Sequence, residues 1–272
     1  MCVCALAIFP PRSSAQYKEI DRLGKDLAGA CMHVRPEAKI IAVADFKDTS
    51  GTNNDQGHYF ALVVTAAINI HLKNGFALAD HNDFDAALEK SGIARQSLIA
   101  GNSVAAVAGK INVATIVIGD LRREQNSYIL RISAVSVSNG AVLYSTEAEF
   151  RGDEFLDSLA KPFPPPGIDP PVKIKQGPEA GGIHAPVCEK CQVPTYTNAA
   201  RSAKLQGTVL FETIISSDGD VQALRPRKVL GLGLDEAAYD LITKRWRMKP
   251  ATDKAGNPIS VVVPIEVTFR LY

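Results

Sequence analysis

The stretch PISVVVPIEVTFRL, residues 258–271, alternates apolar and other side chains along nearly its whole length. Alternate side chains of a β-strand lie on the same face, and one face here collects the apolar ones, Ile259, Val261, Val263, Ile265, Val267, Phe269 and Leu271. Pro264 falls on the other face, and a proline inside a strand belongs at a sheet edge or bulge because it has no N–H. The pattern predicts a long, half-buried strand at the edge of a sheet.

The residues before this strand complete a small unit. Residues 208–216 and 221–229 are strand-like and flank a turn, which predicts a hairpin. A helix follows, because Asp235 and Glu236 suit its positive end and apolar residues recur along one of its faces. Residues 195–272 therefore form a predicted ββαβ unit.

A proline-rich linker, residues 156–194, precedes that unit. Nine of the 16 prolines of the chain lie between residues 161 and 194. Proline fixes φ and removes a backbone donor, so such a density predicts a stiff spacer without packed helix or sheet. The two units that it separates are expected to fold independently.

Residues 17–155 show helical periodicity alternating with apolar runs, and Asn139-Gly140 is a strong hairpin signal between the last two runs. The predicted order is αβαβααβββ, an α/β sandwich. Before it, residues 1–16 resemble an export signal with a short apolar segment and small residues near its end, although the basic start is missing. We interpret them as a weak signal peptide or as part of a longer one.

Composition excludes some classes of protein. Lys and Arg number 30 against 29 Asp and Glu, a net charge of +1, which argues against a nucleic-acid binder. No apolar run reaches the roughly 18 residues that a transmembrane helix needs.

The C-terminal unit resembles the C-terminal domain of the TonB family, the energy transducers of Gram-negative envelopes. The matching pieces occur in order: Pro194-Thr195-Tyr196, Gly207-Thr208-Val209, Asp218-Gly219-Asp220-Val221, Leu230-Gly231-Leu232-Gly233-Leu234-Asp235, Trp246-Arg247-Met248-Lys249-Pro250-Ala251, Gly256-Asn257-Pro258 and Phe269. Thr197 departs from the pattern, because a proline commonly follows the tyrosine. The first unit resembles the smaller domain of FlgO-like, CsgG-like and TolB N-terminal proteins through residues 40–46, Gly119-Asp120-Leu121 and Asn139-Gly140.

These resemblances imply a non-enzymatic periplasmic or envelope protein without a cofactor. The partner they imply is an outer-membrane TonB-dependent receptor, bound by strand addition to the last strand through Val261, Val263, Ile265, Val267 and Phe269. An ExbB/ExbD-type motor is expected only if an anchor exists, and an edge strand also allows a homodimer. An envelope-assembly factor or a thiol–disulfide redox protein remains the alternative.

Cys188 and Cys191 leave three interpretations open: a structural disulfide, free thiols, or a redox or metal pair. The run Asp80–Asp85 lacks the Gly and the distal Glu of a calcium loop, so we interpret it as a helix cap, and the histidines show no paired ligand spacing. The sequence predicts no metal site. The basic residues around Arg225 and Arg247 form either an ordinary solvated face or one that attracts acidic receptor segments.

Overall fold

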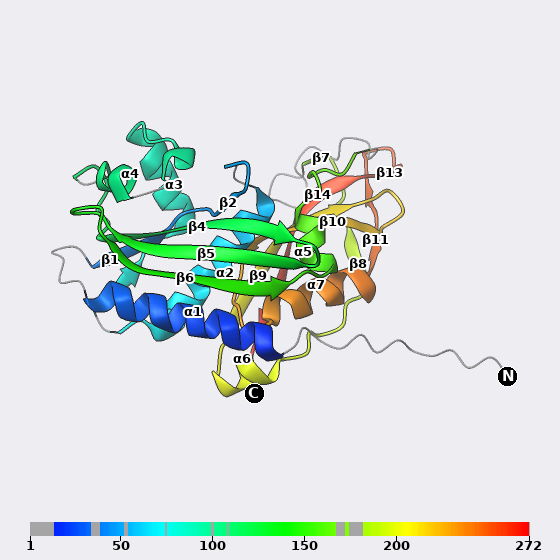
Figure 1. The fold of residues 1–272 in the computed structure, drawn as a ribbon. Coiled ribbons are helices and arrows are strands. Elements are labelled where there is room, and N and C mark those ends of the chain that lie inside the picture. The colour runs from blue at the N-terminus through cyan, green and yellow to red at the C-terminus, as the bar shows by residue number, and fades with distance from the viewer. Residues whose placement is uncertain are drawn as a thin grey trace.

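The computed structural model describes residues 14–33, 39–51, 54–73, 75–98, 101–107, 109–166, 172–173 and 182–271 (Figure 1). The fold is mixed α/β, as predicted, with the two expected kinds of unit. Residues 1–13 lie outside the described part, so the signal-peptide prediction for residues 1–16 is not tested. None of the helices within these ranges is long and apolar enough to span a membrane.

The N-terminal unit is built on one sheet of six strands. Its order is β3 (Ala77–Leu78), β1 (Ile40–Val43), β4 (Thr115–Glu124), β5 (Ser127–Ser136) and β6 (Val142–Arg151), and β2 (Lys47–Asp48) also pairs with β4. Strand β1 runs parallel to β3 and β4, whereas β4, β5 and β6 form an antiparallel meander. The predicted αβαβααβββ order is confirmed, with β2 as a short addition.

Helices cover both faces of this sheet (Figure 1). Helices α1 (Ser14–His33) and α2 (Asp55–His71) lie on one face, and α3 (His81–Lys90), the 3-10 turn η1 (Arg95–Ser97) and α4 (Gly101–Ala105) lie on the other. Strand β1 shows why: Ile41 and Val43 belong to the first core and Ala42 to the second. Asp80 caps α3 by accepting from the N–H groups of Asn82 and Asp83, so the first residue of the run Asp80–Asp85 is the cap of this helix.

The C-terminal sheet has the order β10 (Val221–Lys228), β9 (Gly207–Ile215), β14 (Val261–Phe269) and β7 (Val172–Lys173). Helix α7 (Leu234–Lys244) packs on β9 and β10. The alternation in β14 is confirmed, because its odd-numbered side chains are buried while Pro264, Glu266 and Thr268 are exposed. Short elements complete the unit: α6 (Asn198–Ser202), β8 (Val187–Lys190), β11 (Arg247–Lys249), β12 (Ala251–Thr252) and β13 (Pro258–Ile259).

The expectation that the linker contains no packed sheet is wrong in part. Strand β7 pairs with β14, and β8 pairs with β11, so the linker does contribute to sheets. Neither Val172–Lys173 nor Val187–Lys190 contains a proline, so both keep the N–H groups that pairing needs.

The linker does not hold the two units apart. One hydrophobic core runs through both of them, and α2 packs against β10. Phe155 on α5 (Glu154–Leu159) contacts Tyr239 on α7, with ring centroids 4.6 Å apart. The domain boundaries and the independent folding of each unit stay predictions.

Candidate functional site

The outer edge of β14 is the first candidate site. Strand β14 pairs with β9 along its whole length, from Val261 to Phe269. On its other side, β7 pairs only with Val261 and Val262. Among the described residues, no strand pairs with the outer side of β14 beyond Val262. The edge predicted from Pro264 is therefore covered at its start and open over the rest.

The backbone direction follows from one hydrogen bond. The Val172 N–H of β7 donates to the carbonyl of Ser260 at 3.0 Å, which places that carbonyl on the outer side. Successive residues of a strand direct their backbone N–H and C=O groups to opposite sides. The backbone groups of Pro264, Glu266 and Thr268 therefore point to the same outer side as those of Ser260. Pro264 has no N–H to offer, so Glu266 and Thr268 are the outward donors of the open edge.

A hollow lies at each end of this open edge. One, of about 260 Å³, is lined by Val193, Pro194, Tyr196, Thr268, Phe269 and Arg270. The other, of about 270 Å³, includes Val262, Pro264, Lys173 and Arg227. The first hollow is walled by apolar side chains next to an outward donor, and Val193 in it is 84% exposed. A strand added to the edge could place a side chain there.

The five residues predicted for this site need a more precise description. Val261, Val263, Ile265, Val267 and Phe269 are core residues whose side chains are buried under the sheet. A partner strand would instead meet the outward backbone of Pro264, Glu266 and Thr268. The two-residue repeat of the sequence already separates these two groups, because the residues with buried side chains alternate with those whose backbone points outward.

The other candidate residues of the C-terminal unit are two cysteines and two arginines, and the structure agrees with the expectation for only some of them. Cys188, on the exposed strand β8, and Cys191, directly after that strand, form a disulfide with Cα atoms 6.0 Å apart. Arg225 is 2% exposed, so the prediction that it belongs to a solvated basic face is wrong. Its guanidinium faces the N-terminal unit, which a strand pattern alone does not reveal. Arg247 is exposed, as predicted.

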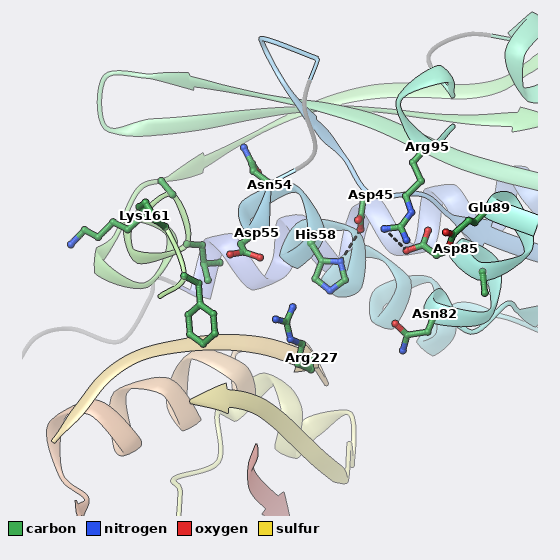
Figure 2. Close-up of a pocket in the computed structure, with 15 residues that line it drawn as sticks. Asp45, Asn54, Asp55, His58, Asn82, Asp85, Glu89, Arg95, Lys161 and Arg227 are labelled. Atoms are coloured by element: carbon green, nitrogen blue, oxygen red, sulfur yellow. Dashed lines mark hydrogen bonds and ion pairs between the residues drawn. The ribbon is translucent and has the colours of Figure 1, made fainter. Parts of the chain in front are cut away.

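A larger cavity, about 870 Å³, lies between the two units (Figure 2). The N-terminal unit contributes polar side chains to its lining, including Asp45, His58, Asp85 and Arg95. From the other side, Arg227 on β10 points toward the same space, as Figure 2 shows, and is paired with Glu212. The start of the linker, including Lys161 and Phe163, lines the end of the cavity.

Two histidines share one carboxylate at the wall of this cavity. The ring nitrogen Nδ1 of His58, on α2, lies 2.8 Å from Oδ1 of Asp45, which follows β1. The ring nitrogen Nε2 of His81, at the start of α3, lies 2.8 Å from the same oxygen. The two rings meet edge to face with centroids 4.9 Å apart. We call Asp45, His58 and His81 the histidine cluster.

The electrostatics of the cluster follow from burial and pairing. Burial raises the pKa of Asp45, but the hydrogen bond to His58 and the charges of His58 and His81 outweigh it, so the pKa of Asp45 lies well below its usual range. Burial lowers the pKa of His81, and contact with Asp45 reverses this to give a raised value. Burial also raises the pKa of the neighbouring Asp85, whose carboxylate pairs with Arg95 at 3.0 Å.

No residue spacing in the sequence indicated this cluster. Its members are separated by 13 and 23 positions and come from a strand end and two helices. The one weak signal was a short polar run, Asp80–Asp85, of which only His81 enters the cluster.

Comparisons with solved structures give low similarity. The LpoB C-terminal domain from Escherichia coli matches with 14% identity and a TM-score of 0.36, over 48% of this chain and 98% of that one. Lipoprotein GNA1162 from Neisseria meningitidis matches with 12% identity and a TM-score of 0.31, over 43% of this chain and 82% of that one. Values this low do not bear on function. No curated protein matches the chain.

The C-terminal unit has a clear family match. Residues 192–271 match the family model described as the Gram-negative bacterial TonB protein C-terminal. The match spans the sheet strands β9, β10 and β14 together with α7, and therefore includes the open edge. The resemblance of the first unit to FlgO-like, CsgG-like and TolB N-terminal proteins stays a prediction. Residues 192–271 of the chain thus form a TonB-type C-terminal domain, which follows the N-terminal α/β unit.

Proposed function

We propose that this chain is a non-enzymatic protein of the bacterial cell envelope whose TonB-type domain binds an extended segment of an outer-membrane protein by strand addition. The family match supports the class of partner. The open part of the β14 edge supports the mode of binding and is the observation that carries the proposal.

A partner strand would find a defined set of groups on this edge. Glu266 and Thr268 would donate their N–H groups, and the carbonyls of Pro264, Glu266 and Thr268 would accept. Main-chain bonds of this kind supply affinity, whereas pockets for alternate side chains supply specificity. The hollow beside Thr268 and Phe269 favours an apolar side chain, and Arg270 at its rim favours an acidic residue nearby.

Thr268 offers a test with a matched control. Thr268→Pro removes an outward N–H, while its side chain is exposed and leaves the core untouched. Thr268→Val keeps that N–H and removes only the hydroxyl, which lies 3.1 Å from the hydroxyl of Thr208. The probes are synthetic peptides that span the periplasmic segments of the outer-membrane receptors of the source bacterium, titrated by calorimetry.

We expect Thr268→Pro to weaken binding by about 1 kcal/mol or more, roughly fivefold in Kd, and Thr268→Val to bind like the wild type. Circular dichroism checks that each variant is folded. Unchanged affinity in folded Thr268→Pro would overturn the proposal. A dimer seen by light scattering that Thr268→Pro dissociates would assign the edge to a second copy of the chain instead.

The envelope location has its own test. Fusion of the chain to a reporter enzyme that is active only outside the cytoplasm should give activity in cells. An inactive fusion that is nevertheless expressed would contradict export. Coupling to an ExbB/ExbD-type motor lies beyond this proposal, which concerns binding.

A further inference from the structure

We propose that the histidine cluster, Asp45, His58 and His81, is a binding site for a late first-row divalent cation such as Zn²⁺. One possible ligand atom from each of the three residues lies within 4.8 Å of the other two. Two imidazoles and one carboxylate are ligands typical of zinc. This site is separate from the β14 edge and does not depend on the proposed function.

One member of the cluster, His81, lacks hydrogen-bond partners among the described residues. The His81 side chain is 8% exposed, and neither of its ring nitrogens has a hydrogen-bond partner among the described residues. Its Nε2 lies 2.8 Å from Asp45 Oδ1, but the contact is not aligned as a hydrogen bond. Buried polar atoms are rarely left in this state. A cation bound by Nε2 would supply the missing partner.

The spacing of the three groups is close to what an ion needs. Each histidine nitrogen lies 2.8 Å from the shared carboxylate oxygen. Ligands bound to zinc at about 2.0–2.2 Å in a tetrahedron lie roughly 3.3 Å apart. Entry of an ion therefore requires each histidine nitrogen to move away from the carboxylate oxygen by roughly half an ångström.

The surroundings fit a site that solvent can reach. Asp45 and His58 line the 870 Å³ cavity, and His81 lies behind them. A position left open by the three protein ligands would face the cavity and take water. The carboxylate of Asp85 lies 3.6 Å from the same nitrogen, His81 Nε2, and pairs with Arg95 at 3.0 Å, so it adds negative charge beside the three proposed ligands.

The helix that carries His58 also provides a control. His71, on the same helix, contacts a single carboxylate, with Nε2 2.8 Å from Asp21 Oδ1. This pair is more exposed and has no second imidazole in the described structure, so it should not hold an ion tightly. His58→Gln and His71→Gln therefore remove the same kind of contact at two sites, of which only one is the proposed metal site.

The test titrates Zn²⁺ into the full, oxidised, untagged chain by calorimetry and repeats the titration with His58→Gln, His81→Gln and His71→Gln. We expect tight binding to the wild type and to His71→Gln, and a loss of roughly 100-fold or more in the two cluster variants, since even outer partners of a metal site are worth 10–100-fold. The visible spectrum of bound Co²⁺ should lack the thiolate charge-transfer band, which excludes the cysteines as ligands.

Equal binding by the wild type and both cluster variants would overturn the proposal, and so would the absence of tight binding to the wild type. His81 is buried, and its variant can fail to fold. His58, with a side chain that is 20% exposed, then decides the question alone. Circular dichroism identifies the folded variants.

Discussion

Arg225 and Asp55 join the two units of the chain. The Nε of Arg225, on β10, donates to Oδ2 of Asp55 in the first turn of α2. The same guanidinium donates to the carbonyl of Lys161 in the linker and lies over the ring of Phe163, 5.1 Å from its centroid. One buried side chain therefore contacts the N-terminal unit, the linker and its own strand.

Removal of Arg225 should destabilise the protein strongly. Arg225→Ala leaves Asp55 and the carbonyl of Lys161 without their partner, and because the Asp55 side chain is 34% exposed, the loss should approach but not exceed the lower end of the about 3–5 kcal/mol that breaking a fully buried pair costs. Arg227→Ala is the control, because Arg227 lies on the same strand but its pair with Glu212 is more exposed and is worth about 0–1 kcal/mol. Urea unfolding measures both. Equal losses in the two variants would show that the interface does not depend on Arg225.

The local parts of the fold could be predicted from the sequence. The alternation through β14 and the Asn139-Gly140 turn depend only on residues that are neighbours in the sequence. The structure has strands where these patterns predict them. The same holds for the helix that begins at Leu234. Short-range patterns fix such elements because their periods are those of the strand and the helix.

The contacts between distant segments could not be predicted in this way. Arg225 occupies a strand position with basic neighbours, and contacts with α2 and with the start of the linker bury it. The histidine cluster forms because β1, α2 and α3 end or begin at one place, which no residue spacing shows. The pairing of β7 with β14 depends on the path of the linker, for which proline density is a poor guide.

The Cys188–Cys191 disulfide should prove dispensable. It closes a loop of only three-residue separation on an exposed strand, so it restricts the unfolded chain by about 2 kcal/mol at most. We expect Cys188→Ser/Cys191→Ser to keep its fold and its peptide affinity, as measured by circular dichroism and calorimetry. A reductase or isomerase activity that this variant loses would contradict the non-enzymatic proposal.

Cys31 allows the disulfide to be checked by thiol labelling, because it is a free cysteine that should not react in the folded protein. It is buried in the core of the N-terminal unit, and burial raises its pKa to about 12. Iodoacetamide at pH 8 should therefore leave Cys31 unmodified in the folded protein while it labels Cys188 and Cys191 after reduction. Peptide mapping by mass spectrometry distinguishes the sites.

Asp235 should make stability fall as the pH rises toward neutrality. It is fully buried at the start of α7, and burial, together with the charge of Glu236, raises its pKa from 3.8 to about 7. The hydrogen bonds that its carboxylate accepts from two backbone N–H groups lower the pKa and only partly offset this rise. Between about pH 4 and 7 the folded chain holds a proton there that the unfolded chain releases. The free energy of unfolding should therefore decrease with pH, by up to about 1.4 kcal/mol per pH unit from this group.

Asp235→Asn should flatten that dependence, and Asp240→Asn, an exposed change on the same helix, should not. Urea unfolding at several pH values gives the difference curves. Parallel curves for Asp235→Asn and the wild type between pH 4 and 7 would mean that Asp235 is ionised throughout this range.

Gly57 should prove essential to the approach of α2 to the end of β1. A Cβ built on Gly57 would lie 1.9 Å from the carbonyl oxygen of Phe46, far inside contact distance, so Gly57→Ala must push the helix away. Overpacking of this kind costs about 1–3 kcal/mol. The shift would also move the next residue, His58, away from Asp45, so Gly57→Ala should bind Zn²⁺ more weakly if the cluster is a metal site.

Gly29 on α1 supplies the opposite case. Among the residues that the structure describes, a Cβ on Gly29 meets nothing within 4 Å, so Gly29→Ala should stabilise the protein by about 0.5–1 kcal/mol through helix propensity alone. Thermal unfolding of the two variants should thus give shifts of opposite sign. A Gly57→Ala protein as stable as Gly29→Ala would show that α2 does not lie against the Phe46 carbonyl. Loss of Zn²⁺ affinity in Gly57→Ala with little loss of stability would instead locate the effect in the position of His58.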